Sequence, residues 1–75
     1  MKLTAKDLED IRNYYAISQS QLAEKLGISQ SYVAHMERNA RPIPAYVADK
    51  LEITPERLEA IRSAAYEREK FINEK

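Results

Sequence analysis

The sequence contains no cysteine, and this absence excludes both a disulfide framework and a zinc site with thiolate ligands. It contains one histidine, His35, which cannot by itself build a multi-histidine metal site. No apolar run approaches the roughly 20 residues of a membrane span, and residues 1–6 lack the apolar stretch of a secretory signal. We therefore expect a cytoplasmic protein with no metal, no cofactor and no membrane association.

Net charge is also missing. Twelve Lys and Arg balance twelve Asp and Glu, so the formal net charge is zero. Residues 1–48 hold six bases and five acids, and residues 49–75 hold six bases and seven acids, so neither half is a basic arm. Because DNA-binding domains usually carry a basic excess, this balance weighs at first against a nucleic-acid partner.

The chain is short. Its 75 residues predict a single domain, residues 1–75, with one core and no room for a large enzyme cleft. A composition of 44% hydrophobic and 32% charged residues is typical of a globular chain and argues against disorder. His35 has no evident acid partner, and no glycine-rich loop is present to cradle a phosphate, so an enzyme is not expected.

Helix signals dominate the sequence. It has one glycine and three prolines, and apolar residues recur at intervals of three and four in five segments. Helix starts are predicted after Thr4, Ser18 and Ser29, near Pro44, and after Thr54. The expected inward positions are Leu8, Ile11, Tyr15, Leu22, Ala23, Leu26, Val33, Met36, Val47, Leu51, Leu58 and Ile61. The prediction is an all-α, five-helix fold whose last helix covers about residues 55–72.

The most informative stretch is residues 19–38. Two short helices are separated only by Gly27-Ile28-Ser29, so they must cross steeply. Ala23 is small enough for the crossing, and Gly27 accepts a positive φ without steric cost. Ile28, Val33 and Met36 can fill the corner beneath them. This is the pattern of a helix-turn-helix, whose second helix is free to enter a major groove, although a generic helical hairpin with a glycine stop fits it too.

From about Leu8 to Ile53 the sequence resembles the Cro and phage-repressor type of helix-turn-helix domain, also called the xenobiotic-response-element family. The resemblance is carried by Ile17-Ser18-Gln19, Leu22 to Ser29, Val33, Glu37-Arg38-Asn39 and Arg41-Pro42, with Ser-Gln-x-x-Leu-Ala-x-x-x-Gly as its most specific part. It implies a sequence-specific DNA-binding domain, commonly a repressor that acts as a dimer.

The sequence departs from this family at three positions. The family often has glycine where Ala16, Asn39 and Glu52 stand. Asparagine tolerates a left-handed backbone, so Asn39 is a mild change, whereas Ala16 and Glu52 bear on the local loop geometry.

The resemblance places Gln30, Ser31 and His35 at base-reading positions, with Tyr32 beside them. A glutamine can pair with adenine N6 and N7, and a serine can bond to several bases. Gln30 and Ser31 are also ordinary first-turn helix residues, and His35 can equally contact a phosphate or be solvated. For Tyr32 we consider a contact to a thymine methyl, a phosphate contact through its hydroxyl, or a half-buried ring that covers the turn.

The resemblance also implies contacts to the DNA backbone. Gln19 begins the second helix, where phosphate is favoured, and is expected to contact the backbone and brace Gln30. Arg38 and Arg41 flank the loop after the third helix and are expected to clamp phosphates. The backbone N–H groups of Asn39 and Ala40 can bind the same strand.

Two residues have a structural role by the same resemblance. Arg12 matches an arginine of the first helix that pairs with a glutamate at the end of the third, here Glu37. We expect a partly buried ion pair that fixes the third helix against the first.

The last helix carries an apolar stripe beyond what four short helices can cover. Ala65, Phe71 and Ile72 are therefore expected to form a self-association surface, and the alternative is a solvated helical tail. A two-fold dimer would place two recognition helices about 34 Å apart.

Two functions remain open. The first is a DNA-binding transcriptional regulator from a bacterium, phage or mobile element, with double-stranded DNA as its partner. The second is a protein-interaction module of the same fold, bound to a toxin or another regulator. Alanine at Gln30, Ser31, Arg38 and Arg41 distinguishes them, because it should abolish DNA binding and leave a partner of the last helix bound.

Overall fold

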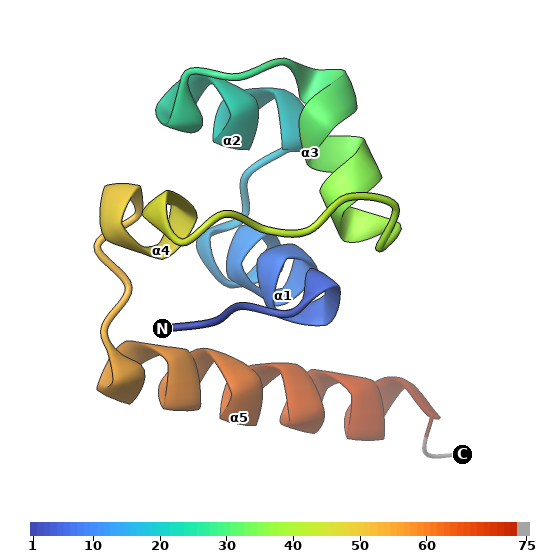
Figure 1. Cartoon of the computed structure of the whole chain (residues 1–75). Coiled ribbons are helices and arrows are strands. Elements are labelled where there is room, and N and C mark those ends of the chain that lie inside the picture. Colours follow the sequence, from blue (N-terminus) through green and yellow to red (C-terminus); the bar gives the residue numbers. More distant parts are fainter. Residues whose placement is uncertain (74–75) are drawn as a thin grey trace.

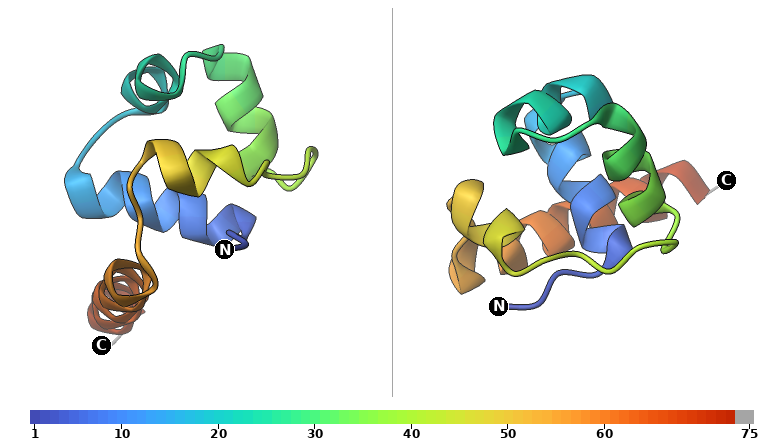
Figure 2. Two further views of the ribbon diagram at one scale, coloured as in Figure 1. Left: turned by 60° about the vertical axis from the view of Figure 1, so that its left-hand side comes forward. Right: turned by 45° about the horizontal axis from the view of Figure 1, so that its top comes forward.

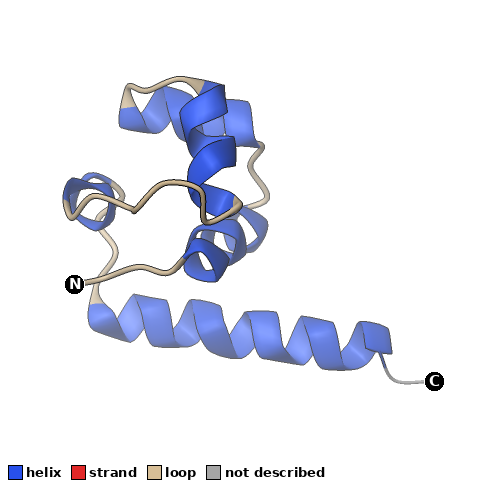
Figure 3. Ribbon diagram, turned by 45° about the vertical axis from the view of Figure 1, so that its right-hand side comes forward, coloured by secondary structure: helices blue, strands red, loops and turns tan. Residues whose placement is uncertain are grey.

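A computed structural model describes residues 1–73 and shows five helices within that range (Figure 1). They are α1 (Ala5–Tyr15), α2 (Gln19–Leu26), α3 (Gln30–Glu37), α4 (Tyr46–Lys50) and α5 (Pro55–Asn73). The described residues contain helix and loop and no strand (Figure 3). The predicted all-α fold with a long last helix is confirmed. None of these helices is long and apolar enough to cross a membrane.

The helix starts lie where the sequence predicts them in four of five cases. A side-chain oxygen accepts a hydrogen bond from the backbone N–H three residues on, at 3.0–3.1 Å, for Thr4, Ser18, Ser29 and Thr54. Asp7 and Gln21 complete capping boxes on α1 and α2 by accepting from the N–H of the cap residue. The fourth helix begins later than expected, at Tyr46. Pro44 precedes this helix, and its carbonyl accepts a hydrogen bond from the N–H of Val47.

Each of α1 to α4 ends in the same backbone device. A residue with positive φ follows the helix, and the angles are 56° at Ala16, 72° at Gly27, 62° at Asn39 and 55° at Glu52. The N–H of the next residue then bonds to a carbonyl five positions earlier, at 2.8–3.0 Å. These are Schellman corners, which satisfy the last carbonyls of a helix. The three departures from the family therefore adopt the left-handed backbone that glycine would adopt without strain.

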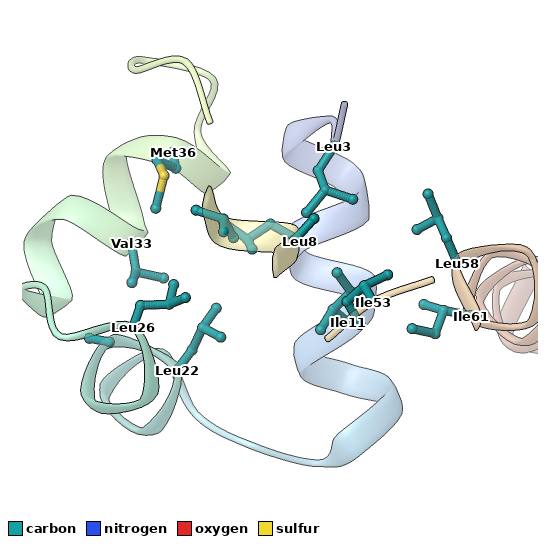
Figure 4. Close-up of a cluster of buried hydrophobic side chains, with 13 residues drawn as sticks. Leu3, Leu8, Ile11, Leu22, Leu26, Val33, Met36, Ile53, Leu58 and Ile61 are labelled. Atoms are coloured by element: carbon teal, nitrogen blue, oxygen red, sulfur yellow. The ribbon is translucent and has the colours of Figure 1, made fainter. Parts of the chain in front are cut away.

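Helix α1 lies at the centre of the core, with α2 and α3 on one side and α5 on the other (Figures 2 and 4). The largest fully buried side chains are Leu8, Ile11, Leu22, Leu26, Val33, Met36, Val47 and Ile61, all predicted inward positions. Leu51 is half-buried against this core. The N-terminal segment adds Leu3, which the sequence analysis did not include.

Tyr15 is a correction to the expected core. It is 44% exposed and is the last residue of α1. Its hydroxyl accepts from Nη1 of Arg57 at 2.9 Å, and its ring meets Tyr14 edge to face, with centroids 5.0 Å apart.

Helix α5 is attached to α1 by apolar side chains at one end and by charged pairs along its length. Leu58, Ile61 and Ala65 are buried. Arg62 binds Asp7 through two hydrogen bonds of 2.8 Å each. Beyond Ala65 charged side chains join the two helices: Lys6 of α1 bonds to Glu69, and Arg68 lies 3.9 Å from Asp10. Within α1, Lys6 also bonds to Asp10.

The Asp7–Arg62 pair predicts a dependence of stability on pH. The bonds from Arg62, assisted by the backbone N–H of Thr4, hold the pKa of the Asp7 carboxyl below its usual range, although burial opposes them. Because the folded-state pKa is lowered, ionised Asp7 stabilises the protein at neutral pH, and this contribution is lost as the pH falls below about 4. We expect Asp7→Asn to lower the melting temperature at pH 7, with a gap to the native protein that narrows toward pH 3.

Thermal unfolding followed by circular dichroism between pH 3 and pH 7 measures this gap. Glu24→Gln is the matched control, since it removes an exposed carboxylate on α2. Its melting temperature should equal that of the native protein at every pH. A constant gap for Asp7→Asn over the whole range would contradict the expectation.

Candidate nucleic-acid interface

Helices α2 and α3 meet at the turn Gly27-Ile28-Ser29, at the end of the molecule opposite α5 (Figures 1 and 3). Val33 and Met36 anchor α3 in the core and are fully buried. The other side of α3 faces solvent, and nothing in the described part of the chain covers it. The helix is therefore presented as a ridge whose polar side chains are free to contact a partner.

The predicted base-reading residues share this surface. Gln30, Ser31 and His35 are exposed, whereas Tyr32 is half-buried and packs against the core, which is the ring-over-turn arrangement considered above. Ser31, Tyr32 and His35 line a shallow pocket of about 300 Å³ together with Ser29 and Arg41. The structure thus brings the four residues together on one face, with different degrees of exposure.

The partner of Gln30 differs from the expected one. Oε1 of Gln30 accepts from Oγ of Ser20 at 2.8 Å, and the side-chain amide of Gln19 donates elsewhere, to Glu37. Ser20 stands one residue further into α2 and so lies beside the start of α3. The sequence analysis missed this serine, because only the crossing of the two helices shows which side chain of α2 lies next to Gln30.

Gln19 is instead directed to the end of α3. Its Nε2 donates to Oε1 of Glu37 at 3.2 Å, and the residue is half-buried. The amide that was expected to brace Gln30 therefore braces Glu37. The cause is the position of Glu37, whose side chain reaches the first turn of α2 and is only 6% exposed.

Arg12 and Glu37 lie together as the resemblance implies. Nε and Nη2 of Arg12 bond to the two carboxylate oxygens of Glu37 at 2.6 and 3.0 Å, and Nη1 donates to the carbonyl of Ile17 at 3.2 Å. The bond to Glu37 raises the pKa of Arg12, so the guanidinium stays charged. With Gln19 included, one cluster joins α1, α2 and α3 and fixes the angle at which α3 is presented.

Two arginines lie at the loop after α3. Arg38 and Arg41 are exposed, and within residues 1–73 neither forms an ion pair. Nη2 of Arg38 lies 3.3 Å from Nδ1 of His35, and it donates to this nitrogen in the tautomer whose ring proton is on Nε2. Both guanidinium groups are thus free to bind phosphate.

The backbone at Asn39 and Ala40 is not free. The N–H of Asn39 donates to the carbonyl of Met36 at 3.1 Å, and that of Ala40 to the carbonyl of His35 at 2.8 Å. Both donors close the corner after α3, which corrects the expectation that they bind the DNA strand. Only the side chain of Asn39 remains exposed there.

The expected self-association residues separate into two groups. Ala65 is 5% exposed within the single chain, because α5 packs on α1 at that point, so it does not belong to a free surface. Phe71 and Ile72 are 79% and 65% exposed, and Tyr66 is a further exposed ring on the same helix.

Across residues 1–73, no group of His, Asp and Glu is arranged to hold a metal ion.

In a comparison with known protein families, a model described as helix-turn-helix matches residues 8–54, which begin within α1 and end just before α5. Neither the curated proteins nor the solved structures searched give a match to this chain.

Proposed function

Because the chain belongs to the helix-turn-helix family, in its Cro and phage-repressor type, we propose that it is a sequence-specific repressor that inserts α3 into the major groove of double-stranded DNA. The family consists of DNA-binding regulators and is not an enzyme family. The observation that carries the proposal is the surface of α3, where Gln30 and Ser31 are exposed while Val33 and Met36 hold the helix in the core. The DNA of a bacterium, phage or mobile element would place this function in the cytoplasm.

The geometry at Gln30 supports direct reading of a base. The hydroxyl of Ser20 donates to Oε1, and among the described residues no hydrogen bond engages the amide N–H groups of Gln30. A glutamine side chain presents a donor and an acceptor side by side, the arrangement that matches adenine N7 and N6 in the major groove. Ser31 lies beside it, and His35 lies one turn further along α3.

Arg38 and Arg41 supply the phosphate contacts that position α3. With few cations on this face and no net charge, one protomer gains little from electrostatics, so the proposal includes a homodimer that binds two half-sites. Phe71 and Ile72 give α5 an exposed apolar end suited to self-association.

A second function of the same fold is favoured by one observation. The net charge of zero and the exposed Phe71 and Ile72 also suit a protein-interaction module that binds a toxin or another regulator. In that case Arg38 and Arg41 would be without consequence for binding.

Selection of binding sites from randomised duplex DNA by the full chain tests the proposal. We expect enrichment of an inverted repeat whose half-site centres lie about one helical turn apart, and loss of this enrichment in Arg38→Ala/Arg41→Ala. If no sequence is enriched and binding of the chain to duplex DNA does not depend on the salt concentration, the interaction module is favoured and the proposal is overturned. Enrichment of a single half-site would overturn the dimer alone.

A further inference from the structure

A second hollow lies next to the recognition surface, between the N-terminal segment and the loop after α3. It measures about 680 Å³ and has Leu3 and Ile43 among its apolar lining. Lys2 lines it from the N-terminal segment, Lys6 from the first turn of α1, and Arg41 from the loop. The two segments run alongside each other in the right-hand view of Figure 2. We call this hollow the N-terminal groove.

The N-terminal groove continues the surface of α3. Arg41 lines both this groove and the shallow pocket formed with Ser31 and His35. A partner that contacts the exposed side of α3 and then follows the surface past Arg41 therefore enters the groove directly.

The free charge along the groove is of one sign. Residues 1–6 and 38–45 contain no acid. Of the two acids that border these segments, Asp7 is bound to Arg62 and Glu37 is bound to Arg12. Lys6 is neutralised by Asp10 and Glu69. Lys2 and Arg41 are exposed, and within the described chain no carboxylate lies within ion-pair distance of either. A chain with no net charge thus keeps free cations on both walls of one groove.

We propose that the N-terminal groove holds the sugar–phosphate backbone that borders the major groove entered by α3, with Lys2 as a phosphate contact beyond Arg41. Cations on two walls of an open hollow of about 680 Å³, adjacent to the exposed side of α3, suit an extended polyanion better than an isolated anion. The inference rests on the proposed function and adds to it an N-terminal residue outside the matched region 8–54.

The salt dependence of DNA binding tests this assignment. Each phosphate neutralised by the protein contributes about 0.9 to the slope of log K against log salt for duplex DNA. Lys2→Ala is expected to reduce the slope by about 0.9 per protomer, to leave the ratio of specific to non-specific binding unchanged, and to leave the melting temperature unchanged. Lys2→Arg is expected to keep the native slope.

Lys70→Ala is the matched control, because it removes the same charge from the exposed side of α5. The measurement uses the duplex selected by the native chain, titrated at several salt concentrations. A native salt slope in Lys2→Ala, or an equal reduction in Lys70→Ala, overturns the role of Lys2 while the proposed function stands. Absence of DNA binding by the native chain overturns both.

Discussion

Replacing Arg12 by alanine is expected to lower the free energy of unfolding by about 3–5 kcal/mol, the cost of leaving a buried charge without its partner. The variant loses three hydrogen bonds at once and strands the carboxylate of Glu37, which is 6% exposed. A domain of this size has a total stability of roughly 4–11 kcal/mol. Arg12→Ala should therefore remove from about a quarter to all of the stability of the protein at 25 °C.

Chemical denaturation followed by circular dichroism measures the effect, with Arg38→Ala as the matched control. Arg38 is an exposed arginine with no ion pair in residues 1–73, so its removal should change the stability by less than about 0.5 kcal/mol. Arg12→Lys keeps the charge but loses the two-pronged geometry, so we expect a smaller loss of stability. This variant can be measured if Arg12→Ala does not fold. Equal melting temperatures for Arg12→Ala and Arg38→Ala would refute the expectation.

A double variant separates loss of the pair from loss of a charge. Arg12→Met/Glu37→Leu replaces both charges by apolar side chains, and such replacements often recover or exceed the original stability. We expect it to be more stable than Arg12→Ala. Its α3 would lose the bond between Glu37 and Gln19, so a change in DNA affinity with recovered stability would show that the cluster orients the recognition helix.

The second large effect concerns Gln30. A two-point contact between glutamine and adenine discriminates by about 1–3 kcal/mol, so Gln30→Ala should weaken binding to the selected duplex by roughly 5- to 150-fold per half-site. The loss should be confined to one base position, because alanine cannot distinguish adenine from the other bases there. Competition binding with duplexes altered at single positions measures both quantities.

Two variants serve as references for Gln30→Ala. Ser20→Ala removes only the bond that orients Oε1, and should show the same base dependence with a smaller loss. Arg38→Ala removes a proposed phosphate contact and should weaken binding equally for all sequences. If Gln30→Ala weakened binding to every duplex by the same factor, Gln30 would be a backbone contact and not a base reader.

The features that the sequence predicted correctly depend on residues that lie close together along the chain. Thr4, Ser18, Ser29 and Thr54 cap helices because their hydrogen-bond partners stand only three positions away. The buried stripe of each helix follows from its periodicity in the same way. The family resemblance added the Arg12–Glu37 pair, whose members are 25 positions apart.

What the sequence missed depends on how helices cross. The Asp7–Arg62 pair joins residues 55 positions apart, and its existence depends on how α5 lies on α1. The same packing buries Ala65, which the sequence alone assigned to a dimer surface. Ser20 and Gln19 are neighbours on α2, and only the angle between α2 and α3 decides which of them meets Gln30 and which meets Glu37.

The Schellman corners also bear on the order in which the protein folds. Each is closed by hydrogen bonds between residues three and five positions apart, and contacts of this kind form within microseconds. The bonds between α1 and α5 close a loop of more than fifty residues, which carries a larger entropic cost and forms more slowly. Helices α1 to α4 are therefore expected to acquire their structure first, and α5 to dock onto α1 last.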